Sequence, residues 1–271
     1  MLWELMEAGI SPDLVVGVSA GAINSAFFAF DPSLTMVRAM ATLWSQLRTR
    51  DVLGISWSTV LGLVGLRNYL VEPHRLRALL SRELPYREIS ATRVPLSIVA
   101  ADQYTGEDVL FAEGKVIDAI LASAAIPGVF PPVTINQQIL VDGAVAVGSP
   151  IEAACRLGAT RLIVLPCGFT CVQQAIPTHP IGRAMHAITL IGARQLRQDF
   201  AHHSKTAQIY VVPPLCPMSC SAYDYSHGAE LIATARDATR QWLHTGGFGA
   251  YRFSRTIGGA YPLGITVPVL R

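Results

Sequence analysis

The sequence predicts a layered α/β fold, because segments with helical and strand patterns alternate along the whole chain. The predicted strands are short and continuously apolar, which is typical of strands covered by helices on both faces. The 271 residues are enough for one sizeable domain, and neither a repeat nor a linker divides them. We therefore expect one domain over residues 1–245, followed by a Gly-rich tail of uncertain structure over residues 246–271.

The first half of the chain begins with a short helical pattern over residues 2–8 that Gly9 closes. The apolar run Leu14–Val18 then predicts a buried strand, and the small residues from Ala20 onward predict a helix that leaves it. The further elements expected here are a helix over 32–48, a helix from 73 to about 80, a strand over 95–101 and a returning hairpin strand over 109–111.

The second half continues the alternation of helix and strand. Pro127-Gly128 ends a helix over 116–125, and Asn136-Gln137 divides two short strands, of which the second covers 139–141. The remaining expected elements are helices over 150–157, 181–202 and 229–244 and strands over 161–165 and 209–212.

The composition argues against several classes of protein. A net charge of +2 with scattered basic residues is not that of a nucleic-acid binder, which usually carries a basic patch. No run approaches the roughly 18–20 apolar residues that cross a bilayer. Glu4 and Glu7 stand where a signal peptide would be positively charged, and five cysteines are an odd number. We expect a cytoplasmic protein whose contact with a membrane, if any, is peripheral and transient.

Two features leave alternatives open. Cys167 and Cys171, like Cys216 and Cys220, are separated by three residues, whereas tight zinc sites more often use two and add histidines. Buried or loop thiols are favoured, and no metal is expected. Residues 52–72 carry few charges, and a core helix with a connecting loop is favoured there over a lid or lipid-facing wall above an active site.

The segment Gly17-Val18-Ser19-Ala20-Gly21 is the centre of the functional prediction. A serine between two glycines, directly after a buried strand and before a helix, is the context of a nucleophile elbow. The tight turn raises the Ser19 hydroxyl above the sheet, and the helix N-terminus with the Ala20 N–H favours negative charge on a reacting carbonyl oxygen. The alternative is a Gly-rich turn in which Ser19 caps the helix. The flanking strand and helix favour the nucleophile.

A serine hydroxyl needs a base, and Asp142 is the candidate. The strand over 139–141 delivers this aspartate to a strand end, where Gly143 and Ala144 follow. A carboxylate there reaches a serine at the end of a neighbouring strand, and Gly143 leaves room for the close approach. Taken alone, Asp-Gly is most often only a turn, so that interpretation stays open.

Together these motifs resemble a known family. Gly17–Ala22 with Asp142–Ala144 looks like the paired signature of patatin-like phospholipases, and Ala122–Pro132 is similar to a further block of bacterial members. The resemblance covers about residues 1–245. It implies a three-layer α/β/α fold around a mainly parallel sheet.

The same resemblance implies a serine lipid acyl hydrolase of phospholipase A or esterase type. It makes Ser19 the nucleophile and Asp142 the general base of a Ser–Asp dyad that works through an acyl-enzyme. The implied partner is a phospholipid or another acyl-ester lipid, and neither a metal nor an organic cofactor is implied.

The sequence departs from the family pattern at its start. Family members place a strand and a Gly-rich loop, whose amides bind the oxyanion, before the serine, whereas here only 18 residues precede Ser19. We expect this strand and loop to be missing, which leaves the flank of strand 14–18 unpaired. Each lost oxyanion donor costs about 10²–10³ in rate. A sequence that begins too late is favoured over a weak or inactive relative.

Two rival functions complete the sequence analysis. The order Ser19, Asp142 and a later histidine permits an α/β-hydrolase triad, with His179, His186 and His227 as candidates. Such enzymes, however, place several strands before the elbow. The second rival is a patatin-like scaffold that binds lipid or protein without turnover. The intact serine and aspartate motifs favour the dyad.

Overall fold

The computed structural model describes residues 1–52, 54, 59, 62, 66–166, 180–215, 224–248 and 265–270. Its strands are β1 (Leu14–Val18), β2 (Leu96–Asp102), β3 (Asp108–Phe111), β4 (Val133–Ile135), β5 (Gln138–Asp142), β6 (Arg161–Pro166), β7 (Gln208–Val211) and β8 (Ile265–Leu270). Its helices are α1 (Leu2–Glu7), α2 (Ala20–Phe30), α3 (Leu34–Gln46), α4 (Thr49–Val52), α6 (His74–Glu83), α7 (Val116–Ser123), α8 (Pro150–Arg156), α9 (Pro180–His203) and α10 (Gly228–His244). Short 3-10 turns are η1 (Ile89–Ala91), η2 (Gly143–Val145) and η3 (Tyr225–His227).

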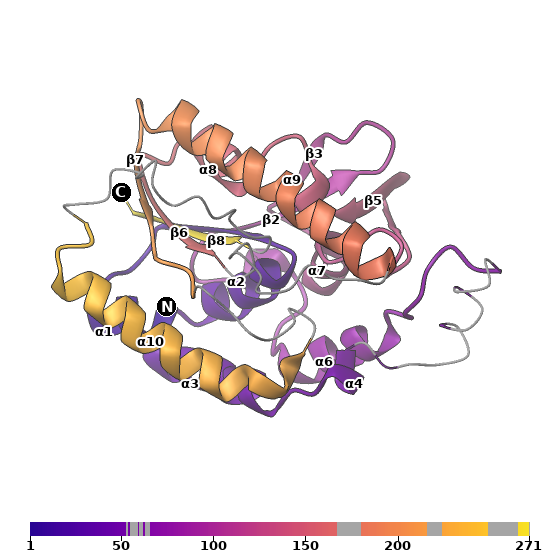
Figure 1. Ribbon diagram of the computed structural model, residues 1–271, viewed down its shortest axis with the longest axis horizontal. Helices are drawn as coiled ribbons and strands as arrows, with labels where there is room; N and C mark the ends of the chain where they lie inside the picture. Colours follow the sequence, from indigo (N-terminus) through magenta and orange to yellow (C-terminus); the bar gives the residue numbers. More distant parts are fainter. Residues whose placement is uncertain are drawn as a thin grey trace.

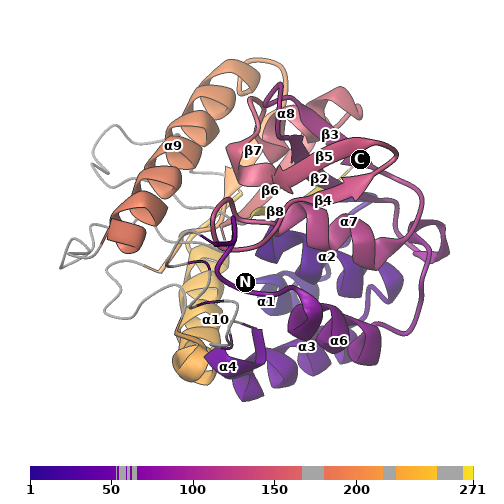
Figure 2. The ribbon, with the colours of Figure 1, turned by 90° about the vertical axis from the view of Figure 1, so that its right-hand side faces the viewer.

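Helices cover both faces of one eight-stranded sheet. In Figure 1, α8 and α9 lie above the sheet, while α1, α2, α3 and α10 lie below it. Figure 2, turned by 90°, shows the same two helical layers on opposite sides of the strands. The three-layer α/β/α fold predicted from the sequence is therefore confirmed.

The sheet is mixed, but most of its strands point one way. Its path of hydrogen-bonded neighbours is β4-β5-β2-β1-β8-β6-β7, and β3 pairs with β2. From the pairings, β1, β2, β4, β6 and β7 run in one direction and β3, β5 and β8 run in the other. The carboxyl ends of β1, β2 and β6 consequently lie along one edge of the sheet, which is where α/β folds hold their ligands.

The flank of β1 that was expected to be unpaired is covered. β8 lies between β1 and β6 and pairs antiparallel with both, with Val16 opposite Val267 and Leu162 opposite Val269. The expectation of an open sheet edge beside β1 was therefore wrong. The tail over 246–271 carries no periodic signal, yet its residues 265–270 satisfy the backbone groups of a central strand.

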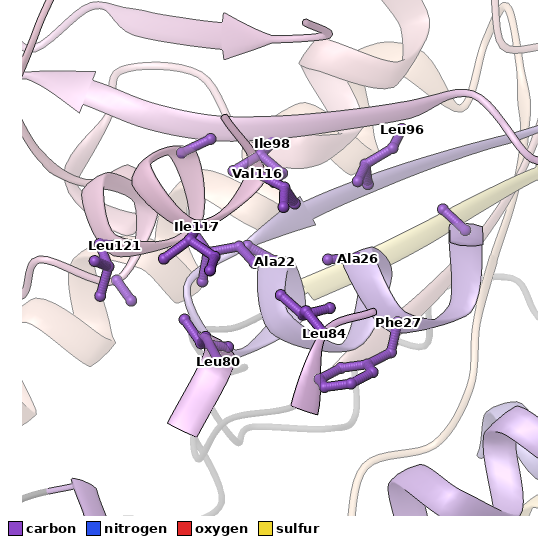
Figure 3. Close-up of a cluster of buried hydrophobic side chains, with 14 of the residues drawn as sticks. Ala22, Ala26, Phe27, Leu80, Leu84, Leu96, Ile98, Val116, Ile117 and Leu121 are labelled. Carbon is purple, nitrogen blue, oxygen red and sulfur yellow. The ribbon is translucent and has the colours of Figure 1, made fainter. Parts of the chain in front are cut away.

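The strand β1 is apolar throughout because both of its faces are buried. Val15 belongs to the lower core, while Val16 and Val18 pack in the upper core against residues of α8 and α9 such as Ile151 and Leu196. Figure 3 shows the lower core, where side chains of α2, α7, β2 and the end of α6 interdigitate. Fully burying one such aliphatic side chain contributes about 1.5–3 kcal/mol to the stability of the fold, so these contacts hold α2 firmly against the sheet.

Several sequence predictions fall outside the described residues. These are the cysteine pairs at 167/171 and 216/220, His179, and about half of the segment 52–72. Among the described helices, none combines the length and apolar character that crossing a bilayer requires.

Candidate active site

β1 and β5 pair with successive parts of β2, and this brings Ser19 to Asp142. β1 runs parallel to β2 and ends with Val18 opposite Val99, while β5 runs antiparallel and ends with Asp142 opposite Ala100. Both use the same flank of β2, because β3 occupies the other flank along this stretch. The two strands therefore meet end to end, and residues 123 positions apart in the sequence become neighbours.

The turn at Ser19 is strained in the way an elbow requires. Its φ of 54° and ψ of −124° are unusual for a residue with a side chain, and such strain persists only where the surroundings enforce it. A Cβ on Gly17 would lie 2.5 Å from the Ser25 Oγ and 2.7 Å from the Ala22 Cα. Glycine at 17 thus lets α2 pack closely against the strand that precedes it. Gly21 is buried in the first turn of α2.

The side chain of Ser19 is directed to a carboxylate. Its Oγ donates a hydrogen bond of 2.6 Å to Asp142 Oδ2. It makes no capping bond to the amides of α2, so the interpretation of Ser19 as a side-chain N-cap was wrong. Asp142 Oδ1 accepts from the Ala144 N–H at 2.8 Å, so the Asp-Gly turn is formed as well. The turn holds one carboxylate oxygen while the serine uses the other.

Burial tunes the carboxyl group. Asp142 is 3% exposed, and this burial raises its pKa to about 6, although the hydrogen bonds from Ser19 and Ala144 act in the opposite direction. The group is ionised at neutral pH, and its proton affinity is closer to the operating pH than that of an ordinary aspartate. A general base works best in this range.

Gly143 and Ser123 hold the two strand ends in place. A Cβ on Gly143 would lie 2.3 Å from the Val99 carbonyl oxygen, so only glycine fits after Asp142. Ser123, fully buried at the end of α7, accepts from the Ser19 N–H at 2.9 Å and donates to the Val99 oxygen at 2.6 Å. Ser123 was not among the predicted site residues. Its only signal was its place in the block Ala122–Pro132.

Of the three histidines proposed for the rival triad, the two that the structure describes, His186 and His227, are not hydrogen-bonded to Asp142. His227 faces Asp224 and Glu230 at 3.6 and 3.4 Å, and His186 lies on α9. In the part of the chain that the structure describes, the side-chain hydrogen bonds of Asp142 come from Ser19 and Ala144, not from a histidine. The described residues therefore place a serine beside an aspartate, without a third residue of a Ser–His–Asp triad between them.

Known proteins share this region of the chain. The family model described as Patatin-like phospholipase matches residues 1–155, a range that includes Ser19 and Asp142. Uncharacterized NTE family proteins of Mycobacterium bovis and Mycobacterium tuberculosis are 33% identical over 154 residues, which is 56% of this chain and 24% of theirs. The patatin-like phospholipase domain-containing protein 7 of Rattus norvegicus is 25% identical over 170 residues, 62% of this chain and 12% of that protein. The matched segment is thus a small part of each relative.

Proposed function

This chain belongs to the patatin-like phospholipase family, and we propose that it hydrolyses acyl esters of lipids with Ser19 and Asp142 as its catalytic dyad. The observation that supports the dyad most is the 2.6 Å hydrogen bond from the serine hydroxyl to a buried carboxylate. The nucleophile and its base are within reach of each other at the carboxyl edge of the sheet, as covalent catalysis requires.

The first half of the proposed reaction forms an acyl-enzyme. Asp142 takes the proton of the Ser19 hydroxyl while Oγ attacks the ester carbonyl carbon. The tetrahedral intermediate then collapses, the bond from the carbonyl carbon to the alcohol oxygen breaks, and the alcohol leaves with the proton from Asp142. The acyl group remains on Ser19, and the carboxylate is again free to accept a proton.

The second half releases the acid. A water molecule gives a proton to Asp142 and attacks the acyl carbonyl. The bond to Ser19 Oγ breaks, Oγ recovers the proton from Asp142, and the carboxylic acid leaves. The same group thus serves as base and then as acid in each half.

Negative charge on the carbonyl oxygen needs donors, and the start of α2 is the proposed source. The first amides of a helix have no intrahelical acceptor, and its dipole favours an anion there. Ala20 directly follows the nucleophile, which is the position that commonly supplies one oxyanion donor. Its N–H is the donor that we propose for this chain.

Turnover of a short-chain chromogenic aryl ester tests this function. We expect the wild-type chain to hydrolyse it and Ser19→Ala to lose the activity, whereas Ser45→Ala, at a half-buried serine on α3 whose hydroxyl donates to the Thr42 oxygen, keeps it. His186→Ala and His227→Ala should also keep it, and a large loss in either would favour a triad. Equal rates for wild type and Ser19→Ala would contradict the proposal and favour a lipid-binding scaffold.

A further inference from the structure

An open cavity of about 290 Å³ lies beside α2 and is bordered by α1, α3, α10, the carboxyl end of β6 and the residues that follow β7. The residues that line it are mostly apolar, and they include Leu2, Trp3, Met40, Trp44, Leu165 and Ile232. Its volume lies just below the roughly 300–1,000 Å³ that small-molecule sites occupy. A cavity of this size and lining suits a slender apolar ligand.

The polar side chains of the lining are engaged with one another or with their neighbours. The Asn24 Oδ1 accepts a hydrogen bond of 2.8 Å from the Trp44 indole. The Arg236 guanidinium donates to Glu4 at 2.7 Å and lies 3.8 Å from the centre of the Trp3 ring. A polar ligand would have to disrupt these contacts. An alkyl chain would leave them intact while it covers the apolar wall.

The cavity lies at the same edge of the sheet as the dyad. Leu165 and Pro166 end β6, which runs in the same direction as β1, the strand that ends before Ser19. Asn24 is five residues after Ser19 on helix α2, or about 7.5 Å along the helix axis at ~1.5 Å per residue. Ser19 and Asp142 are not among the residues that line the cavity, so an acyl chain attached at Ser19 would enter it by running along α2 for about this length.

We propose that this cavity binds the acyl chain of the substrate and sets the chain length that the enzyme prefers. The inference rests on the proposed role of Ser19, because the chain must start at the acylated serine. Each methylene group that moves from water into an apolar site improves binding about fourfold. The ratio kcat/KM should therefore rise with acyl length until the cavity is filled.

A matched pair of substitutions on α3 tests the proposal. Ala41 lines the cavity, whereas Ala39, two residues away on the same helix, is exposed. With aryl esters from butyrate to laurate, Ala41→Phe should lower kcat/KM about tenfold or more for the long chains and less than twofold for butyrate. Ala39→Phe should keep the wild-type profile. If Ala41→Phe does not fold, Ala235→Phe on α10 fills the cavity from the other side, with exposed Ala233→Phe as its control.

Direct binding gives a second readout. Trp3 and Trp44 line the cavity, so a brominated long-chain fatty acid should quench their fluorescence in Ser19→Ala and much less in Ser19→Ala with Ala41→Phe. An unchanged chain-length profile and unchanged quenching in the filled variants would overturn the cavity proposal while ester hydrolysis stands. A wild-type chain inactive toward every ester would instead overturn the proposed function, and this inference with it.

Discussion

The pKa values of two buried carboxyl groups of this protein are shifted in opposite directions. Asp142 is 3% exposed and Glu4 is 4% exposed. Burial raises the pKa of both, but in Glu4 the hydrogen bonds and charges of Arg236 and Arg240 outweigh it, and its pKa is lowered. Among the described residues, the hydrogen-bond partners of Asp142 are a hydroxyl and an amide, and its pKa rises to about 6. The partners, rather than the burial, decide which carboxyl can accept a proton.

The difference separates a structural acid from a chemical one. Glu4 receives bonds of 2.7 and 3.0 Å from two guanidinium groups of α10 and so fastens α1 to that helix. Permanent positive charge beside it keeps it ionised. Asp142 faces a serine hydroxyl that can give up its proton, so this carboxylate can accept that proton as a general base would.

The largest expected effect concerns activity. Asp142→Asn should lower kcat/KM for a short-chain ester by about 10²–10⁴, the usual contribution of a general base. Glu4→Gln, the same chemical change in the other carboxyl, should alter it by less than about threefold. Initial rates of the two purified variants check this, and comparable losses in both would show that the two acids are not functionally distinct.

The pH profile should report the raised pKa of Asp142. The base must be ionised, so kcat/KM should reach half its maximum near pH 6 and fall about tenfold for each pH unit below that. Glu4→Gln should keep the same midpoint, and Asp142→Asn should lose it. A wild-type midpoint near pH 4 would mean that burial does not tune the acting carboxyl.

Removing the charge of Asp142 and removing that of Glu4 should change the free energy of unfolding in opposite directions at pH 8. Ionised Asp142 opposes folding once the pH rises through about 6, because its pKa is higher in the folded than in the unfolded chain. Asp142→Asn should therefore raise the free energy of unfolding at pH 8 by about 1–3 kcal/mol, since one pKa unit is worth about 1.4 kcal/mol. At pH 3, below the ordinary pKa, the gain should vanish. Denaturant unfolding at the two pH values measures it.

Glu4→Gln should destabilise the fold at pH 8 by about 1–3 kcal/mol, because two arginines lose a charged acceptor while both still reach water. The pKa of Glu4 is lowered in the folded chain, so its contribution is present above the ordinary pKa and disappears as the pH falls below it. Urea unfolding from pH 8 to pH 3 follows this. A destabilisation that stays constant over the range would rule out an ionic role.

The smallest effect is expected at Ser123. Ser123→Ala removes the acceptor of the Ser19 N–H and should lower kcat about tenfold with little change in KM, because the elbow is less well positioned. Thr239→Val removes another fully buried hydroxyl, the donor to the Ala235 oxygen on α10, and should leave kcat unchanged. Steady-state kinetics of both variants distinguish positioning from a general loss of stability.

The sequence predicted the local part of this structure well. β1, the turn at Ser19 and α2 follow from apolar, glycine and small residues that are adjacent in the chain. The helices and strands that were predicted were found with small shifts of their ends, whereas α4 and β8 were not predicted. The sequence analysis also predicted that a residue without a side chain is needed at Gly143, and the Val99 carbonyl oxygen indeed lies where a Cβ would be. The catalytic roles of Ser19 and Asp142, and the domain boundary at residue 245, stay predictions.

The unpredicted features depend on contacts between distant parts of the chain. Nothing periodic in the tail indicates that β8 enters the centre of the sheet. The bond from Arg236 to Glu4 spans 232 residues, and the bond between Ser19 and Ser123 spans 104. Which residues become such partners depends on how distant segments pack together, and a periodic pattern along the sequence does not show this.

The most direct test of the dyad is the rate at which a fluorophosphonate labels the protein, with the modified peptide identified by mass spectrometry. We expect wild type to be labelled on Ser19 at a rate that rises with pH around a midpoint near 6. Asp142→Asn should be labelled at least about 10²-fold more slowly, and its labelling rate should not change with pH around 6. Labelling of Asp142→Asn as fast as wild type, or labelling on a residue other than Ser19, would contradict the account.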